Sequence, residues 1–267
     1  MTHLPPFHNT YRSTGSADAP DLVLLHGWGL HSIVWDDVMP GLLEHFRVTV
    51  VDLPGMGQSP LPNDPYTLDF LVGQVASVMP EKAHLMGWSL GGLVALRMAS
   101  LMPERVRSVV SVATSPKFTR SDDWPAAMPG EILAKFAEIF DEDQEGTLIR
   151  FLALNCKGAV TQKDDIRKLR SILYFCGLPA GRALREGLNI LRDTDLRDSL
   201  VEIARPTLML FGEHDNLVPA AVMAEIEAIA PNVELALQQG VSHVPFVSAP
   251  DIFLQAVTDF YRSHQLV

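Results

Sequence analysis

KAHLMGWSLGGLVAL, residues Lys82–Leu96, is the stretch that decides the fold. Its apolar first part leads into the motif Gly87-Trp88-Ser89-Leu90-Gly91, and an Ala-, Leu- and Val-rich helical pattern follows through Met98. This order predicts a strand, a sharp turn and a helix. A serine at such a turn is held in a strained backbone conformation with its hydroxyl above the sheet edge. Amides at the start of the following helix point toward the same place and favour negative charge there.

The motif G-x-S-x-G is not decisive alone. At average glycine usage it should arise by chance in roughly one of ten chains of this length. The alternative is a glycine-rich junction between a strand and a helix, with an ordinary N-capping serine. The rest of the chain must therefore decide whether Ser89 is a nucleophile.

Strand and helix patterns alternate on both sides of this motif. The strand patterns are near-continuous apolar runs, which are typical of a parallel sheet covered on both faces. We expect strands at 21–25, 47–52, 83–86, 107–114, 206–212 and 233–238, and helices at 33–46, 67–79, 90–101, 220–230 and 250–264. Residues 1–20 are rich in Pro, Gly, Ser and Thr and allow one edge strand.

Between residues 115 and 198 the pattern changes to helices without strands. Helical stretches are expected at 131–140, 145–156, 162–175 and 180–191. The sequence thus predicts an α/β fold with a mostly parallel central sheet flanked by helices. We expect residues 1–114 and 199–267 to form its core, and 115–198 to form a helical cap over the carboxyl edge of the sheet.

Composition excludes several classes of function. The chain has 267 residues, of which 47% are hydrophobic, and a net charge of −11, which argues against a general nucleic-acid binder. No apolar run approaches the roughly 18 residues of a membrane span, and the first 20 residues lack the pattern of a signal peptide. The two cysteines, Cys156 and Cys176, are expected to be buried free thiols. We expect a cytoplasmic monomer.

Three residues follow predicted strands in the order serine, acid, histidine. These are Ser89, Asp215 and His243. A neutral serine hydroxyl needs a histidine to remove its proton, and the histidine needs a carboxylate to fix its tautomer. Because ligands bind beyond the carboxyl ends of the strands in such sheets, we expect the three side chains to meet there as a catalytic triad.

Other residues of the same types compete for these roles. Asp52 also follows a strand, but the sequence DLPGMGQS around it is more typical of a structural loop that turns on two glycines. His214 adjoins Asp215, yet as the base it would leave Asp215 without a partner. His26 is expected to stabilise the loop after the first apolar strand through side-chain hydrogen bonds.

A developing oxyanion needs two preorganised amides. We expect the N–H of Leu90 to be one and the N–H of Trp28, in His26-Gly-Trp-Gly, to be the other. The side chains expected to line an acyl pocket are Trp28, Trp88, Phe136, Phe151 and Leu154; for the two tryptophans the alternative is core packing. The mechanism requires no metal or organic cofactor.

The sequences LVLLHGWGL, VVDLPGMGQS, MGWSLGGLVAL, PERV, SP…DWP, FLAL and DLR, with the His243 loop, together resemble the α/β-hydrolase family. Within it they resemble the carboxylesterases of biotin synthesis that demethylate pimeloyl-acyl-carrier-protein methyl ester. The likeness extends over nearly the whole chain after residue 20. It implies hydrolysis of a carrier-bound methyl ester with release of methanol.

This resemblance also implies that basic residues of the cap hold the acyl carrier protein. Arg150 and Arg167 match such positions, Lys163 replaces an arginine, and Gly146 stands where another basic residue is expected. Residues 146–192 contain nine basic and three acidic residues, an excess that can steer an acidic partner. The alternative is a solvated helix face.

Two other functions stay open. A broad short-chain esterase or lactonase, acting on small acyl esters, would use the same triad. A non-enzymatic binding protein of the hydrolase fold would not need an intact triad.

Overall fold

The computed structural model describes residues 4–140 and 142–267. Its centre is a seven-stranded sheet in the order β1-β3-β2-β4-β5-β6-β7. All neighbouring strands are parallel except the edge pair β1 and β3, which is antiparallel. The strands are β1 (His8–Tyr11), β2 (Asp21–Leu25), β3 (Arg47–Val51), β4 (Ala83–Trp88), β5 (Val106–Val112), β6 (Thr207–Gly212) and β7 (Glu234–Gln238). The predicted sheet and its one edge strand are therefore confirmed.

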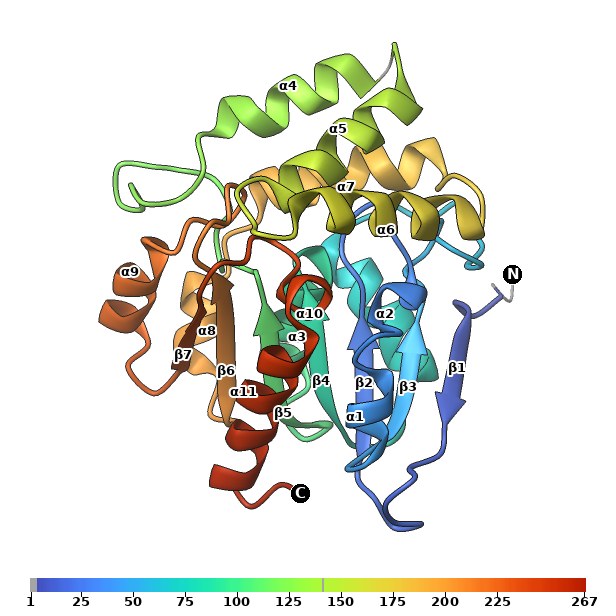
Figure 1. Cartoon of the computed structure of the whole chain (residues 1–267), viewed down its shortest axis with the longest axis vertical. Coiled ribbons are helices and arrows are strands. Elements are labelled where there is room, and N and C mark those ends of the chain that lie inside the picture. Colours follow the sequence, from blue (N-terminus) through green and yellow to red (C-terminus); the bar gives the residue numbers. More distant parts are fainter. Residues whose placement is uncertain (1–3, 141) are drawn as a thin grey trace.

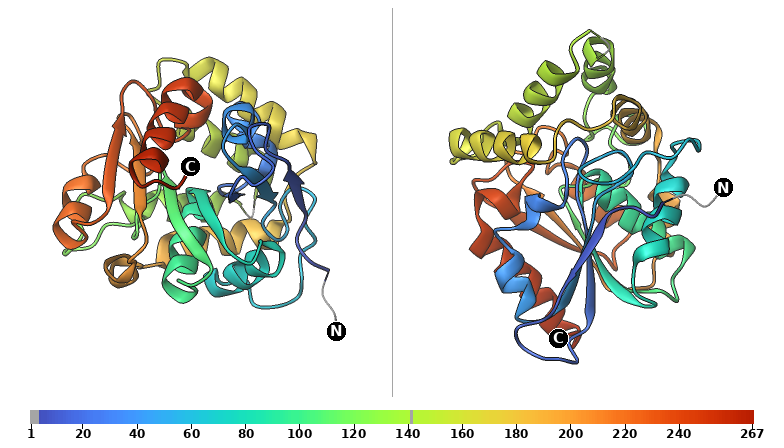
Figure 2. Two further views of the ribbon diagram at one scale, coloured as in Figure 1. Left: turned by 90° about the horizontal axis from the view of Figure 1, so that it is seen from below. Right: turned by 90° about the vertical axis from the view of Figure 1, so that its right-hand side faces the viewer.

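Helices cover both faces of this sheet (Figures 1 and 2). One face carries α2 (Leu68–Val78), α3 (Leu90–Leu101) and α8 (Arg197–Glu202), and the other carries α1 (Met39–Leu43) and α11 (Pro250–Ser263). The remaining short elements are η1 (Ser32–Trp35), α9 (Val222–Ile229) and α10 (Pro245–Ser248). Among the described residues no helix has the length and apolar character needed to cross a membrane.

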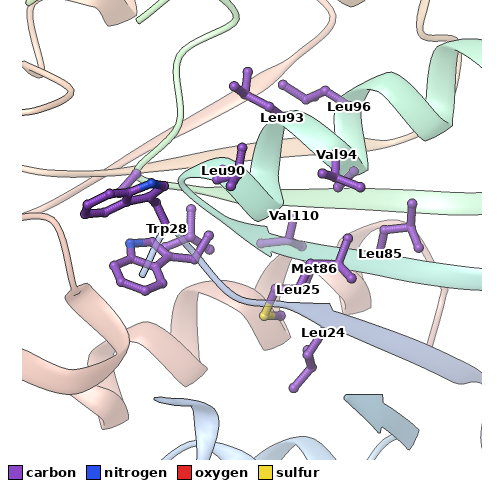
Figure 3. Packing of buried hydrophobic residues seen from close by; sticks show 14 of the residues in the cluster. Leu24, Leu25, Trp28, Leu85, Met86, Leu90, Leu93, Val94, Leu96 and Val110 are labelled. Atoms are coloured by element: carbon purple, nitrogen blue, oxygen red, sulfur yellow. The ribbon is translucent and has the colours of Figure 1, made fainter. Parts of the chain in front are cut away.

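The core is densest where β2, β4 and β5 pack against α3. Every residue of β4 is buried, and so are nine residues of α3. Figure 3 shows leucine and valine side chains of these elements interleaved, with Trp28 and Leu90 at the end of the cluster. An apolar core on both sides of β4 holds the strand in one position, which fixes the turn that follows it.

Some predicted elements are corrected by the structure. The helix expected at 33–46 is instead the short helix η1 followed by α1. Pro40 near the start of α1 supplies no amide for a hydrogen bond to the preceding turn, so one continuous helix cannot form. Helices α8 and α10 were not predicted, because six and four residues are too few to show a helical period. Cys176 is only half-buried, although both cysteines are free as expected.

Four helices between β5 and β6 lie over the carboxyl ends of the parallel strands (Figure 1). We call them the cap helices: α4 (Gly130–Phe140), α5 (Gln144–Cys156), α6 (Gln162–Phe175) and α7 (Gly181–Asp193). Their bounds agree with the predicted stretches to within about two residues. The division of the chain into core and cap at residues 115 and 198 stays a prediction.

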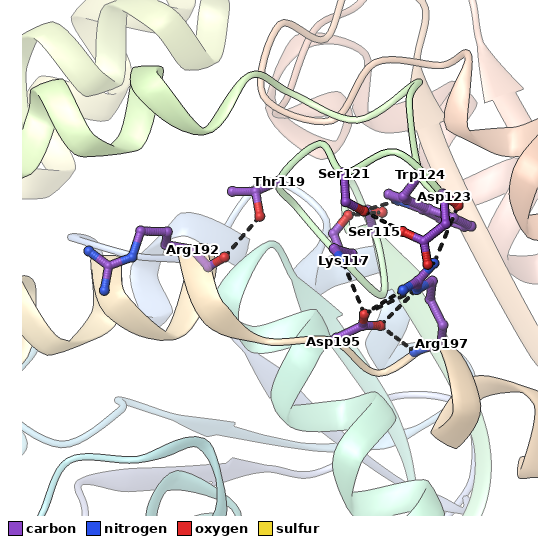
Figure 4. Close-up of polar contacts among 9 residues, drawn as sticks. All are labelled: Ser115, Lys117, Thr119, Ser121, Asp123, Trp124, Arg192, Asp195 and Arg197. Carbon is purple, nitrogen blue, oxygen red and sulfur yellow. Dashed lines mark hydrogen bonds and ion pairs between the residues drawn. The ribbon is translucent and has the colours of Figure 1, made fainter.

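Charged groups join the segments that enter and leave the cap (Figure 4). The Arg197 guanidinium contacts Asp195 at 2.7 Å and Asp123 at 2.9 Å, and lies 5.4 Å from the ring centre of Trp124. Lys117 also contacts Asp195, at 3.2 Å. Hydrogen bonds from Arg197 hold the pKa of Asp195 down at about 2. This network joins the segment that leads from β5 into the cap to the segment that leads out of the cap into α8.

Candidate active site

Ser89 lies at the turn between β4 and α3, with φ +54° and ψ −116°. A positive φ at a serine is a strained conformation, which persists only where the surroundings impose it. The surroundings here are close. A Cβ on Gly87 would lie 2.2 Å from the carbonyl oxygen of Gly91, and one on Gly91 would lie 2.3 Å from that of Leu25. The two glycines of the motif are therefore required sterically.

Asp215 and His243 are in direct contact. Asp215 Oδ2 lies 2.7 Å from His243 Nδ1, and both side chains are fully buried. The other oxygen of the carboxylate, Oδ1, accepts the backbone N–H groups of Leu217 and Val218 at 2.8 and 2.9 Å. Because Oδ1 is occupied by these donors, Oδ2 is left to orient the imidazole. The geometry places the proton on His243 Nδ1.

The backbone of His243 is held from two sides. Its N–H donates to the carbonyl of Asn155 in α5 at 2.9 Å. Its own carbonyl accepts the indole N–H of Trp88, the residue before Ser89, at 2.8 Å. The second imidazole nitrogen, Nε2, is buried without a hydrogen-bond partner within the described residues. An imidazole held in this way can accept a proton at Nε2.

The loop after β2 is held by His26. Its Nδ1 lies 2.7 Å from the carbonyl oxygen of Gly27, and its Nε2 accepts the N–H of Leu53 at 2.8 Å. Burial lowers the pKa of His26 to about 4, so the side chain is neutral near pH 7. The expected side-chain hydrogen bonds of His26 are thus present in the structure.

The amides of Trp28 and Leu90 have no hydrogen-bond acceptor within the described chain. Leu90 is the first residue of α3, where N–H groups have no partner inside the helix. The two side chains meet below Gly187 of α7, where a Cβ would lie 2.7 Å from Trp28 Cδ1 and 3.7 Å from Leu90 Cδ2. Two N–H groups without an acceptor therefore lie just after the carboxyl ends of the neighbouring strands β2 and β4.

The competing residues have structural contacts. Asp52 accepts the N–H of Ser32 at 2.8 Å through Oδ1 and that of Gln58 at 2.9 Å through Oδ2. It therefore folds the loop after β3. His214 is exposed and lies beside Glu213, whereas Asp215, the next residue, points inward. In the part of the chain that the structure describes, neither Asp52 nor His214 forms a hydrogen bond with the side chain of His243.

The cap helices close this site. Ser89 is 2% exposed and His243 is 0% exposed. Phe151 of α5 packs edge-on against Trp28, with ring centres 4.7 Å apart, and Phe136 of α4 packs against Phe151 at 5.3 Å. The indole N–H of Trp28 donates to the carbonyl of Leu184 in α7 at 2.7 Å. An aromatic side chain of α5 thus lies against Trp28, and one of α4 lies against that side chain.

A sequence model described as the alpha/beta hydrolase fold matches residues 20–250. The chain belongs to the alpha/beta hydrolase family. A protein of Aeromonas hydrophila named pimeloyl-[acyl-carrier protein] methyl ester esterase is 42% identical over 242 residues, which is 90% of this chain and 95% of that protein. A protein of Klebsiella pneumoniae with the same name is 41% identical over 92% of this chain and 94% of its own length.

Solved structures of hydrolases show the same fold. A hydrolase from Pseudomonas aeruginosa PA01 has a TM-score of 0.80 and 26% identity, and covers 95% of this chain and 92% of its own. An enol-lactonase from Burkholderia xenovorans LB400 has a TM-score of 0.83 at 21% identity, with 96% of both chains covered. The second likeness concerns the fold alone.

The basic residues expected to contact a carrier lie on the outer faces of α5 and α6. Arg150 lies 3.6 Å from Asp143, Arg167 pairs with Asp164, and Lys163 is exposed. Acidic residues outside the range 146–192 reduce the net positive charge of this surface, because Asp37 pairs with Lys168 and Asp193 pairs with Arg192. Exposed ion pairs of this kind contribute little to stability and exchange partners easily.

Two contacts of this hydrolase were not predicted. Asn155 holds His243 through a backbone carbonyl, which any residue type can supply, so no sequence signal marks it. Trp88 was expected to line an acyl pocket, but its indole hydrogen-bonds to His243 and packs against Phe246, with ring centres 5.4 Å apart. The structure thus shows Trp88 in contact with the backbone of His243.

Two buried histidines make stability depend on pH. Burial lowers the pKa of His84 to about 4, as it does for His26, from an ordinary value of about 6.5. Both are neutral in the folded protein but protonate in the unfolded chain, so stability is full above pH 6.5 and falls as the pH drops toward 4. We expect a loss of roughly 3 kcal/mol from His84 by pH 4, measured by urea unfolding from pH 7.5 to 4.

The control for this prediction is His84→Gln, whose amide can replace the 2.8 Å contact between His84 Nδ1 and Ser108 Oγ. Glutamine does not titrate. Between pH 4 and 6.5 the free energy of unfolding of the variant should therefore depend less steeply on pH, by the amount that corresponds to about one bound proton. An unchanged slope would contradict the assignment.

Proposed function

We propose that this hydrolase is a serine carboxylesterase that hydrolyses the methyl ester of a pimeloyl-acyl-carrier-protein thioester in biotin precursor synthesis. The substrate assignment rests on the sequence identity of 42% between this chain and a relative named for this reaction, over 95% of the length of that relative. The observation that supports the chemistry is the buried pair of Asp215 and His243 beside the strained turn of Ser89.

In the first half of the reaction Ser89 Oγ attacks the ester carbonyl carbon while His243 Nε2 takes its proton. The carbonyl oxygen becomes an oxyanion, which accepts hydrogen bonds from the N–H groups of Trp28 and Leu90. When the intermediate collapses, the C–O bond to methoxide breaks and His243 gives its proton to the leaving group. Methanol departs and the pimeloyl group stays on Ser89 as an ester.

In the second half a water molecule repeats these steps. His243 removes a proton from the water, whose oxygen attacks the acyl carbon, and the bond to Ser89 Oγ breaks as the proton returns to the serine. The product is a free carboxylate on the distal end of the chain, while the thioester to the carrier stays intact. Asp215 balances the charge of the imidazolium in both halves. No cofactor takes part in these steps.

The acyl chain would lie among aromatic side chains of the cap. Phe151 packs edge-on against Trp28, and Phe136 packs edge-on against Phe151. Leu154 lies one turn after Phe151 on α5 and is half-buried. An apolar chain suits such a lining better than a polar one. We assign these four side chains to substrate binding, and Trp88 to support of His243 rather than to the pocket.

The carrier protein would dock on α5 and α6 through Arg150, Lys163 and Arg167. We expect the double variant Arg150→Glu, Arg167→Glu to lower kcat/KM for the carrier-linked ester about 10- to 100-fold, chiefly through KM. Docked carboxylates or phosphates lose their cationic partners and meet like charges instead. Hydrolysis of p-nitrophenyl butyrate, which needs no carrier, should change less than twofold.

A charge control is Arg205→Glu, at a half-buried residue outside the cap whose guanidinium donates to the carbonyl of Pro103; it changes the net charge half as much as the double variant does. It alters the net charge without altering the proposed docking surface. An equal loss for Arg205→Glu would mean that total charge and not docking governs the effect. Equal loss on both substrates would mean that the cap variants damage the site itself.

The rival activity is a broad short-chain esterase or lactonase with the same three residues. It predicts no preference for the carrier-linked ester over p-nitrophenyl acetate. A binding protein without activity predicts that a fluorophosphonate probe leaves Ser89 unlabelled. A cytoplasmic location and a monomeric state remain predictions of this proposal.

A further inference from the structure

Residues 155–165, which comprise the end of α5, the turn after it and the start of α6, contact the segment that carries His243. We call residues 240–248, the loop after β7 together with α10, the histidine loop. Three hydrogen bonds join the two segments at the start, middle and end of that loop: Val160 N–H to the Gly240 carbonyl at 3.1 Å, His243 N–H to the Asn155 carbonyl at 2.9 Å, and Ser248 Oγ to Asp165 Oδ2 at 2.6 Å.

The same turn also contacts the loop that carries Asp215. The side-chain amide of Asn216 donates to the carbonyl of Lys157 at 2.9 Å. One short cap segment therefore holds both the acid and the base from the side opposite the sheet. Two of its bonds to the histidine loop come from the backbone, and the third comes from a side chain.

That side chain is the carboxylate of Asp165. It is 4% exposed, and its Oδ2 accepts the hydroxyls of Thr161 at 2.8 Å and Ser248 at 2.6 Å. No ion pair to Asp165 is found within residues 4–140 and 142–267. Buried polar groups need hydrogen-bond partners, and the partners of Asp165 Oδ2 are these two hydroxyls rather than a cation.

A purely structural role does not explain this placement. Asp165 lies in the first turn of α6, where a negative charge stabilises a helix. Asp164 lies in the same turn and supplies that charge while exposed to water and paired with Arg167. Only Asp165 turns inward and reaches the histidine loop.

We propose that Asp165 is a positioning residue for the base: acting through Ser248, it fixes the end of the histidine loop and so holds His243 in the position from which Nε2 takes the proton of Ser89. This inference rests on the proposed function, because it assumes that His243 is the base. Misplacement of a reacting group by about 1 Å can cost on the order of 100-fold in rate. Removal of one of three bonds to the loop should cost less.

The test compares variants that keep or remove the acceptor and the donor. Ser248→Ala and Asp165→Ala remove the bond, while Ser248→Thr keeps the hydroxyl and Asp165→Asn keeps an oxygen for both donors. Asp164→Ala is the matched control for the helix charge. The readouts are kcat and KM for p-nitrophenyl butyrate and the rate at which a fluorophosphonate labels Ser89, with urea unfolding to check the fold.

We expect Ser248→Ala and Asp165→Ala each to lower kcat and the labelling rate about tenfold, with KM within twofold. The double variant should be no slower than either single one, and Ser248→Thr, Asp165→Asn and Asp164→Ala should stay near the wild type. An unchanged kcat in Ser248→Ala overturns the proposal. So does an equal loss in Asp164→Ala, or a loss in Asp165→Asn as large as in Asp165→Ala.

Failure of the proposed function gives a different result. If the wild type cleaves p-nitrophenyl butyrate but not the carrier-linked methyl ester, the substrate assignment is wrong while the variant pattern still supports the positioning role. If Ser89 in the wild type is neither labelled nor active on any ester, both proposals are overturned.

Discussion

Replacement of Ser89 by alanine is expected to lower kcat about 10⁵- to 10⁶-fold on every ester that the protein cleaves. The loss is large because the hydroxyl forms the covalent intermediate, and because the unpartnered Nε2 of His243 has no other group from which to take a proton. Steady-state release of p-nitrophenol at equal protein concentrations measures this loss, and fluorophosphonate labelling is a second readout. The variant should not be labelled at all.

The control for Ser89→Ala must separate chemistry from folding. Ser89 has a positive φ, so alanine keeps the same backbone strain and should fold with nearly unchanged stability. A variant that is folded, unlabelled and inactive supports the nucleophile. A folded Ser89→Ala protein that retains even one tenth of the activity would show that another group attacks the ester.

Replacement of Asp215 by asparagine is expected to lower kcat about 10⁴-fold with little change in KM. The reason lies in the two amides that contact Asp215 Oδ1. Asparagine must turn its oxygen toward these donors, so its NH₂ group faces His243 Nδ1. That nitrogen must then accept a hydrogen bond, which moves the imidazole proton to Nε2. A histidine protonated at Nε2 cannot deprotonate Ser89.

The control is Asp52→Asn, the other carboxylate that follows a strand. Asp52 accepts backbone amides with both oxygens and belongs to a structural loop, so its replacement should lower stability more than kcat. The rate constants of both variants and their urea unfolding curves are the measurements. A larger loss of kcat in Asp52→Asn than in Asp215→Asn would reverse the assignment of the acid.

Sequence patterns predicted the sheet and the meeting of Asp215 with His243 for a physical reason. Each residue follows an apolar run long enough for a buried strand, and the ends of parallel strands lie at one edge of the sheet. Order along the chain therefore carries most of the information on the site. The nucleophilic role of Ser89 and the carrier surface at Arg150 stay predictions, because no ligand contact tests them.

The remaining features depend on contacts that sequence patterns do not record. The prediction of one helix at 33–46 was wrong because Pro40 interrupts the helical hydrogen bonds, so that η1 and α1 form instead. The bond between Asp165 and Ser248 joins residues 83 positions apart, and the carbonyl of Asn155 carries no side-chain signal. Trp88 was expected to line an acyl pocket, with core packing as the alternative, and no sequence pattern indicated that its indole N–H donates to the carbonyl of His243.

The central claim is that this chain removes the methyl group from a carrier-bound pimeloyl ester. The most direct measurement is methanol release from pimeloyl-carrier methyl ester by the wild type and by Ser89→Ala, beside release of p-nitrophenol from its acetate and butyrate esters. We predict the higher kcat/KM for the carrier ester, and no release of methanol by Ser89→Ala. Turnover of the small esters alone would contradict the claim and leave a broad short-chain esterase.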